Sequence, residues 1–395
     1  MPDIWRIKKT KYLFSLRNGE AAKEERGGDF SLYGANGVIG EYPYCNINER
    51  KIIIGRVGAS GEVNIAEKRS WISDNALIVN LNKGQDFQYV YYLLKSINFP
   101  ERTNKTAQPL ITAGFIGNFF VPCPEHEEQK AIADFLDLKT AQIDDLIAKK
   151  ERMIELLKEE RTAIINQAVT KGIDSNVGMK DSGIEWLGKV PKHWEIKRLK
   201  YVANINPQRP DGIPDETKVV FMAMESMNAD GTYDNSIVRP YSEVKTGFTY
   251  FAEDDVVFAK ITPCFENGKG AMLRNLGSDI GFGSTEFHVL RAVKSKTIPE
   301  YLYFLTISGL FRELGKAFMQ GVAGQKRVTN NFVQDFVIGV PSVNEQKAVS
   351  SFLGSKIKQI DAQIGREEKS IEYLKEYRTA LISEVVTGKI DVREA

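Results

Sequence analysis

The chain contains an internal repeat, and this repeat constrains the fold more than any other feature. Residues 124–174 align with residues 341–391 without a gap, and about half of the positions are identical. The alignment extends upstream, where Thr112 matches Thr329. A second anchor opens each half, because Trp5 and Tyr12 correspond to Trp194 and Tyr201. The sequence therefore predicts one unit written twice, a globular segment followed by a long helix, with the second globular segment the longer.

Each repeated segment predicts a long helix. Residues 125–174 and 342–395 are poor in Gly and Pro for about 40 residues and rich in Glu, Lys, Leu and Ile. Ser342 and Glu345 have the spacing of a capping box. Apolar residues recur in heptads, which is typical of a coiled coil, and each helix would be about 60 Å long. The heptad positions are Leu136, Ile143, Ile147, Ile154, Leu157 and Ile164, then Leu353, Ile357, Ile360, Ile364, Ile371, Leu374 and Leu381.

The two helices are expected to pair with each other in antiparallel orientation. Tandem copies often pack about a pseudo-twofold axis, which for two helices side by side means opposite directions. One heptad column is interrupted by Lys150 in the first helix and by Glu367 in the second. Antiparallel packing would bring these opposite charges together and favour pairing within the chain. The alternative is that both side chains lie on solvated flanks. In either case the helices would act as a spacer between two globular domains.

The globular segments predict an α+β fold. Short apolar or alternating runs bounded by Gly, Asn and Asp predict strands at residues 51–55, 75–79, 255–259 and 286–290. Stretches with aromatic faces predict short helices at residues 87–96 and 298–308. Polar loops that contain glycine connect these elements.

Composition excludes several classes of protein. The 53 Lys and Arg residues balance 52 Asp and Glu residues, which excludes a histone-like basic protein and an acidic disordered tail. Cys45, Cys123 and Cys264 are widely spaced and form no CxxC motif, so neither a disulfide framework nor a structural zinc site is expected. No apolar run reaches the roughly 18 residues of a membrane span, and the start lacks the apolar stretch of a signal peptide. We therefore expect a soluble protein of the cytoplasm.

We find no sequence motif for a catalytic or metal centre. A GxxxxGK[ST] phosphate loop is absent, and no GxGxxG motif follows a strand. His126, His193 and His288 lie far apart in the sequence, so a histidine metal site or a Ser-His pair has little support. The residues therefore give no indication of a catalytic centre or of a metal site.

Charge is spread unevenly along the chain. Residues 1–124 carry about 16 basic and 12 acidic side chains, whereas residues 125–174 carry about 8 and 12. A basic bias, with Arg, Lys, Asn, Gln and Tyr on glycine-bearing loops, suits contacts to phosphates and bases. Taken alone, this bias favours nucleic acid only mildly.

These features, in this order and twice over, resemble the specificity (S) subunit of type I restriction-modification systems. The resemblance covers the whole chain. It is carried by residues 183–194, the Pro-x-x-x-Glu-Gln-Lys stretches that start at 124 and 341, residues 284–290, and the Arg-Thr-Ala segments at 161–163 and 378–380. It implies target recognition domain 1 at residues 1–124, spacer helix 1 at 125–174, target recognition domain 2 at 175–341, and spacer helix 2 at 342–395. The two domains would be held apart by an antiparallel coiled coil.

The resemblance also implies a division of labour within a prokaryotic defence complex. Each domain would read one half of a bipartite target in double-stranded DNA, and the paired helices would set the spacing. Two methyltransferase subunits would dock on the helices, and restriction motor-nuclease subunits can join them. S-adenosylmethionine, ATP and Mg would belong to these partners, so this chain would be non-catalytic and need no cofactor.

The residues that contact DNA cannot be carried over by motif, because recognition domains are the variable part of this family. From side-chain chemistry alone we expect Arg and Lys to contact guanine or phosphate, and Asn and Gln to contact adenine. The candidates in the first domain are Tyr33, Asn36, Arg56, Ser60, Arg102, Asn104, Lys105 and Gln108. The candidates in the second domain are Lys260, Thr262, Asn267, Lys269, Gln325, Lys326 and Arg327.

Two other functions remain open at this point. The chain could be a coiled-coil scaffold whose two globular domains bind proteins. It could also be a self-contained methyltransferase, which would have to bind S-adenosylmethionine without partners.

Overall fold

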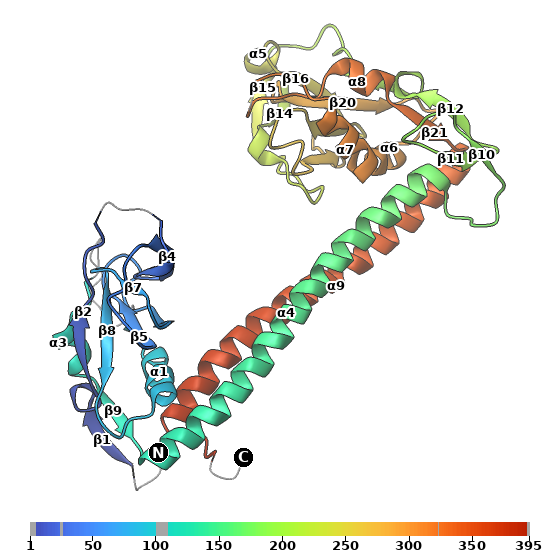
Figure 1. The fold of residues 1–395 in the computed structure, drawn as a ribbon. Helices are drawn as coiled ribbons and strands as arrows, with labels where there is room; N and C mark the ends of the chain where they lie inside the picture. The colour runs from blue at the N-terminus through green and yellow to red at the C-terminus, as the bar shows by residue number, and fades with distance from the viewer. Residues whose placement is uncertain (1–4, 24–26, 100–109, 323, 393–395) are drawn as a thin grey trace. The chain divides into compact units, whose positions relative to one another are not determined.

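The structure is a computed structural model that describes residues 5–23, 27–99, 110–322 and 324–392 (Figure 1). It divides into two compact units. Unit 1 comprises Met1–Arg152 and Glu367–Ala395, and unit 2 comprises Met153–Arg366. Each unit therefore combines one globular segment with a part of both long helices. The four-part division expected from the sequence stays a prediction.

The two long helices form where the sequence predicts them. Helix α4 spans His126–Lys171 and helix α9 spans Val343–Val386 (Figure 1). The Ser342 hydroxyl accepts a hydrogen bond from the Glu345 backbone N–H at 3.3 Å, which is one half of the predicted capping box. The Glu345 carboxylate instead accepts a hydrogen bond from Trp194 Nε1 at 2.9 Å. Of the predicted heptad residues, Ile147, Ile164, Ile364 and Leu374 are partly buried and the others are buried.

Within unit 1, α4 and α9 run in opposite directions. Asp144 Oδ1 lies 3.1 Å from Arg378 Nε, and Lys150 Nζ lies 2.7 Å from Glu367 Oε2. A residue further along α4 therefore meets a residue further back on α9. The predicted contact between Lys150 and Glu367 is confirmed. These two residues are also 217 positions apart, which is the offset of the repeat, so each occupies the place of the other in its own copy.

Gly365 is one of two glycines in the continuous helix α9 and is a poor helix former. Gly365 is exposed, and among the described residues no atom lies within 4 Å of a Cβ built on it. The repeat places Ala148 at the equivalent position of α4. We expect Gly365→Ala to raise the free energy of unfolding by about 0.5–1 kcal/mol, because alanine loses less backbone freedom in a helix. Urea denaturation measures this change. The mirror variant Ala148→Gly is the control and should lower stability by a similar amount; a loss of stability in both variants would contradict the prediction.

The globular segment of unit 1 contains two sheets. The first has the strand order β2-β8-β5-β6, with antiparallel neighbours, and the second has the order β4-β3-β7, in which β3 and β7 are parallel. Strands β1 and β9 form a separate antiparallel pair. The strands are β1 (Arg6–Lys9), β2 (Phe14–Asn18), β3 (Phe30–Gly34), β4 (Gly37–Tyr42), β5 (Lys51–Gly55), β6 (Val63–Ala66), β7 (Trp71–Ile72), β8 (Ala76–Leu81) and β9 (Phe120–Cys123). The helices are η1 (Thr10–Tyr12), α1 (Phe87–Ser96) and α3 (Ala113–Gly117).

Unit 2 repeats this topology and adds β16 at the edge of its second sheet and an antiparallel pair, β10 with β11. Its first sheet has the order β13-β20-β17-β18, its second has β15-β14-β19-β16 with β14 and β19 parallel, and β12 pairs with β21. The strands are β10 (Met179–Asp181), β11 (Lys189–Pro191), β12 (Glu195–Arg198), β13 (Ala203–Ile205), β14 (Lys218–Met222), β15 (Val238–Pro240), β16 (Thr249–Ala252), β17 (Val256–Ala259), β18 (Gly270–Met272), β19 (Ile280–Gly283), β20 (Phe287–Ala292) and β21 (Val337–Val340). The helices are η2 (Leu199–Tyr201), η3 (Met224–Ser226), α5 (Tyr241–Val244), α6 (Pro299–Ile307), α7 (Gly309–Ala317) and α8 (Asn330–Asp335). The duplication therefore includes strands whose sequences no longer align.

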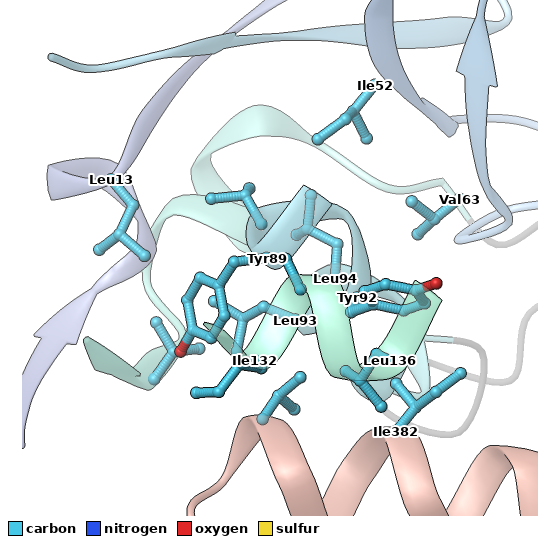
Figure 2. Packing of buried hydrophobic residues seen from close by; sticks show 14 of the residues in the cluster. Leu13, Ile52, Val63, Tyr89, Tyr92, Leu93, Leu94, Ile132, Leu136 and Ile382 are labelled. Carbon is cyan, nitrogen blue, oxygen red and sulfur yellow. The ribbon is translucent and has the colours of Figure 1, made fainter. Parts of the chain in front are cut away.

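Helix α1 packs between the first sheet of unit 1 and the long helices. Figure 2 shows Ile52 and Val63 from the sheet, Leu93 and Leu94 from α1, and Ile382 from α9 in one cluster of buried side chains. The start of α4 contributes to the same cluster. Burial of this apolar surface is the main term that fixes the globular segment to the helices.

A buried glutamine explains the repeated Glu-Gln-Lys motif. Gln129 accepts a hydrogen bond from the N–H of Asp86, the N-cap of α1, and donates to the Pro124 carbonyl, both at 2.9 Å. Gln346 makes the same two bonds in unit 2, to the N–H of Ile298 and the carbonyl of Pro341. The glutamine thus ties the first turn of each long helix to the start of the helix packed beside it.

Candidate nucleic-acid interface

A pair of loops occupies the same topological place in both globular segments. The first loop leaves strand β5 at Arg56 or strand β17 at Lys260. The Arg56 carbonyl accepts a hydrogen bond from the Ile111 N–H at 3.1 Å, and the Lys260 carbonyl accepts one from the Val328 N–H at 2.8 Å. Ile111 and Val328 are equivalent in the repeat, so both copies hold a cation by the same backbone hydrogen bond. We call the strand end and the loop joined by this bond the frame. The spacing from Arg56 to Ile111 differs from that between Lys260 and Val328, so sequence alignment does not reveal this match.

In the first segment, Gly55 allows the turn that carries Asn36 to pack close to Arg56 at the end of β5. Gly55 precedes Arg56, and a Cβ built on Gly55 would overlap the carbonyl oxygens of Ala35 and Ala59. The turn between β3 and β4 therefore packs directly on the end of β5. Asn36 in this turn is exposed, and Arg56 is half-buried. The two side chains that could contact a base or a phosphate thus belong to neighbouring turns.

Two candidates of the first segment point inward and are corrected. Tyr33 is buried among apolar side chains, and its hydroxyl accepts a hydrogen bond from the Glu67 N–H at 3.3 Å. Ser60 is buried, and its hydroxyl donates to the Arg56 carbonyl at 3.0 Å. Both therefore support the loops rather than face a ligand. Arg102, Asn104, Lys105 and Gln108 lie outside the described residues.

In the second segment, residues 260–269 and 324–328 form what we call the loop pair. The Thr262 N–H donates to the Lys326 carbonyl at 2.9 Å, and the Lys326 N–H donates to the Thr262 hydroxyl at 3.1 Å. The structure thus brings together Lys260, Thr262, Lys326 and Arg327, which lie about 60 residues apart in the sequence. Asn267, Gln325 and Lys326 are exposed. Lys269 instead bends back, because its ammonium group donates to the Met224 carbonyl at 3.1 Å.

Arg327 is held by a carboxylate that the sequence analysis did not single out. Its Nη2 and Nε lie 2.8 and 2.9 Å from the two carboxylate oxygens of Glu286. The hydrogen bonds from Arg327 lower the pKa of Glu286, and the same contact raises the pKa of Arg327. The pair therefore stays ionised at neutral pH. No sequence signal predicts this pairing, because Glu286 and Arg327 meet only through the loop pair.

A partly buried arginine, Arg312, supports the first loop of the loop pair. Arg312 on α7 donates to the Phe265 carbonyl at 2.9 Å, and its guanidinium lies 4.7 Å from the centre of the Phe265 ring. Burial lowers the pKa of Arg312 to about 10. Arg312 thus provides a hydrogen-bond donor to the backbone of the loop that carries Asn267. The sequence analysis did not identify this role.

The sequence profile of the type I restriction modification DNA specificity domain matches residues 2–156 and again residues 191–373. The chain belongs to this family. The two matches correspond to the two copies that the repeat predicts.

Individual members of the specificity family are similar to this chain. The EcoEI specificity subunit of Escherichia coli is 34% identical over 200 residues, which are 49% of this chain and 33% of that protein. The MjaVIII specificity subunit of Methanocaldococcus jannaschii is 23% identical and covers 88% of this chain and 80% of its own length. A chain solved in a study of complex assembly and conformational transition of the type I R-M system has the same fold, with a TM-score of 0.73, 13% identity and 99% coverage of both chains. This chain thus spans about a third of the EcoEI relative.

Among the described residues, no group of three or more His, Cys, Asp or Glu side chains could hold a metal ion. Within the same residues, no helix is both long and apolar enough to cross a membrane.

His288 connects strand β20 to the loop pair. Its Nε2 lies 2.9 Å from the Val328 carbonyl and therefore donates the proton, while Nδ1 accepts from the side-chain amide of Asn206 at 3.3 Å. Asn206 also donates to Asn330 at 2.8 Å. Burial lowers the pKa of His288 from 6.5 to about 4. The neutral imidazole thus fixes the end of the loop pair to the sheet.

This histidine predicts a loss of stability in weak acid. Between pH 6.5 and pH 4 the unfolded chain protonates His288 while the folded chain does not, so the free energy of unfolding falls as pH falls. From pH 7 to pH 5 the contribution is about 2 kcal/mol. Urea denaturation at both pH values measures it. His288→Gln, whose amide can still donate to Val328, should show a smaller pH dependence; an equal dependence in both proteins would contradict the assignment.

Proposed function

We propose that this chain is the non-catalytic, DNA-reading subunit of a type I restriction-modification complex. Each globular segment reads one half of a bipartite target in double-stranded DNA. The observation that carries the proposal is the repeated frame of loops, which presents Arg56 with Asn36 in one copy and the loop pair in the other. A common frame with different side chains suits a protein that reads two different short sequences. Membership of the DNA specificity family supports the same function.

In this proposal, the side chains divide between two tasks. Exposed cations such as Lys326 contact phosphates, which position the protein without reading sequence. Asn36, Asn267 and Gln325 are exposed amides, whose paired donor and acceptor match the major-groove edge of adenine. Each segment offers few such groups, so one segment alone gives modest affinity and the complete complex is needed for tight binding.

We further propose that α4 and α9 act as an antiparallel coiled-coil spacer and as the docking surface for two methyltransferase subunits. The charge pair between Lys150 and Glu367 supports antiparallel pairing within one chain, because two identical helices would place like charges there. Leu156 on α4 and Tyr373 on α9 are equivalent in the repeat and are 43% and 56% exposed. Equivalent exposed apolar side chains suit two copies of one partner. S-adenosylmethionine, ATP and Mg would be bound by the partners.

The docking proposal predicts separate losses of the two partners. We expect Leu156→Glu to weaken binding of one methyltransferase subunit about tenfold or more, because a charge would be buried at the contact. Tyr373→Glu should have the same effect on the other subunit, and the double variant should bind neither. Native mass spectrometry of the complex measures the stoichiometry. Ser355→Glu, at an exposed polar position of α9, is the control. Full binding of two subunits by the double variant would contradict the proposal.

The decisive experiment for the main proposal is to express the chain with its methyltransferase partners and sequence all methylated sites. We expect one bipartite motif with a constant gap of unread base pairs. Methylation without sequence preference would reject the proposal and favour the scaffold that binds proteins. Calorimetry of the purified chain with S-adenosylmethionine tests the remaining alternative, because binding would indicate a self-contained methyltransferase.

A further inference from the structure

The ion pair of Arg327 with Glu286 leaves some N–H groups of the guanidinium without a partner among the described residues. Glu286 receives the Nε–H and one N–H of Nη2, at 2.9 and 2.8 Å. One N–H of Nη1 donates to the Gln325 carbonyl at 3.1 Å. An arginine has five N–H donors in a planar fork. Among the described residues, these bonds use three of them.

The two remaining N–H groups belong to Nη1 and Nη2, one on each terminal nitrogen of the fork. The Arg327 side chain is 43% exposed, whereas the Glu286 side chain is 24% exposed. The arginine is therefore the more accessible partner of the pair. With one free donor on each terminal nitrogen, its guanidinium can donate two hydrogen bonds to two adjacent acceptors.

Guanine presents this pattern in the major groove, where N7 and O6 are neighbouring acceptors. A phosphate group also accepts two hydrogen bonds from arginine. The carboxylate of Glu286 distinguishes the two ligands, because its negative charge repels the full charge of a phosphate at the same guanidinium much more than the partial charges of a neutral base edge. Bonds on two sides also hold the side chain in one conformation, which reduces the entropy lost on binding.

We propose that Arg327 reads a guanine in the half-site of the second segment and that Glu286 is the positioning residue that presents it. The backbone supports this arrangement, since the Lys260 N–H donates to the Glu286 carbonyl at 2.8 Å and the Val328 N–H donates to the Lys260 carbonyl. Both residues are thus fixed to the frame that carries the loop pair. The inference rests on the proposed DNA-reading function and adds one residue and one base to it.

The test uses the full chain in complex with its methyltransferase partners and a library of DNA duplexes randomised around the target. We expect Arg327→Lys to reduce the preference for guanine at one position of the second half-site by about tenfold or more, because lysine lacks the fork. All other positions and the first half-site should stay unchanged. Glu286→Ala should reduce the preference at that same position, and Glu286→Gln, which keeps an acceptor, should restore part of it. A purely structural role of Glu286 would instead affect all positions of the half-site.

Lys326→Ala is the matched control, because this exposed neighbour should weaken binding to all sequences alike. Three outcomes of the binding measurement would overturn the inference: a second half-site without a guanine on either strand, an unchanged preference in Arg327→Lys, or a uniform loss in that variant with a weaker salt dependence, which would indicate a phosphate contact. A wild-type complex without any motif would instead reject the DNA-reading function itself. Thermal unfolding of Arg327→Lys and Glu286→Gln checks that both fold, and a loss of folding in both would assign the pair to stability and reject the inference.

Discussion

Four helix-forming residues inserted into each long helix should lengthen the unread gap of the DNA target by about two base pairs and leave both half-sites unchanged. The insertions are placed between Lys150 and Glu151 in α4 and between Arg366 and Glu367 in α9. Lys150 and Glu367 are in contact, so the two insertions face each other in an antiparallel pair. The prediction rests on the proposed role of the helices as a spacer.

The expected size follows from helix and DNA geometry. Four residues add about 6 Å to an α-helix, and two base pairs add about 7 Å to B-DNA. Four residues also turn a helix by about 40° beyond a full turn, which a coiled coil accommodates by local unwinding. An insertion of this length therefore changes the spacing more than it disturbs the apolar seam.

Sequencing of methylated sites measures both the gap and the half-sites in one experiment. The control is a chain with the insertion in α4 alone, which should lose modification because the two helices no longer match. An altered half-site with an unchanged gap in the double insertion would contradict the spacer role.

Asp255→Ala should lower the free energy of unfolding of unit 2 by about 3 kcal/mol. The Asp255 side chain is buried, and its two oxygens accept hydrogen bonds from Arg291 Nε and Nη2 at 2.8 and 2.7 Å. One of them also accepts the Ala252 N–H at 2.8 Å. These contacts raise the pKa of Arg291. Alanine removes all three acceptor contacts and leaves the arginine against the sheet. The loss stays at the low end for a broken buried pair, because the Arg291 side chain is 32% exposed and reaches water.

Urea denaturation monitored by tryptophan fluorescence checks this value, and methylation at the second half-site should fall with it. Asp335→Ala is the control. Asp335 pairs with Arg198 and Lys200, but all three side chains are more than a third exposed, so its removal should cost much less stability than the removal of Asp255. Equal losses in the two variants would show that burial of Asp255 does not determine its contribution.

Local pattern was sufficient where a few neighbouring residues decide the structure. The predicted strand at residues 51–55 and the predicted helix at residues 87–96 appear as β5 and α1 with these bounds, and the cap at Ser342 forms as expected. The contact of Lys150 with Glu367 was also predictable, because the repeat places them at one position of a regular helix pair. Regular geometry converts sequence spacing directly into spatial spacing.

Local pattern failed where the environment of a side chain depends on distant segments. Tyr33 lies on β3 of the second sheet, and it is buried by packing against residues of the first sheet such as Ile53 and Ile78. Glu286 meets Arg327 because strand β20 runs beside the loop pair. Residue type therefore predicted Arg327 as a candidate but did not reveal the carboxylate that holds it.

The sequence by itself determined that the chain is a duplicated unit with two long helices, and it indicated the family. These properties depend on periodicity and repetition, which residues close together in the chain define. Only the tertiary structure decided which candidates face solvent, which cations pair with carboxylates, and that Arg56 and Lys260 occupy one frame. Those properties depend on contacts between segments far apart in the chain, and burial and charge pairing are set by such contacts.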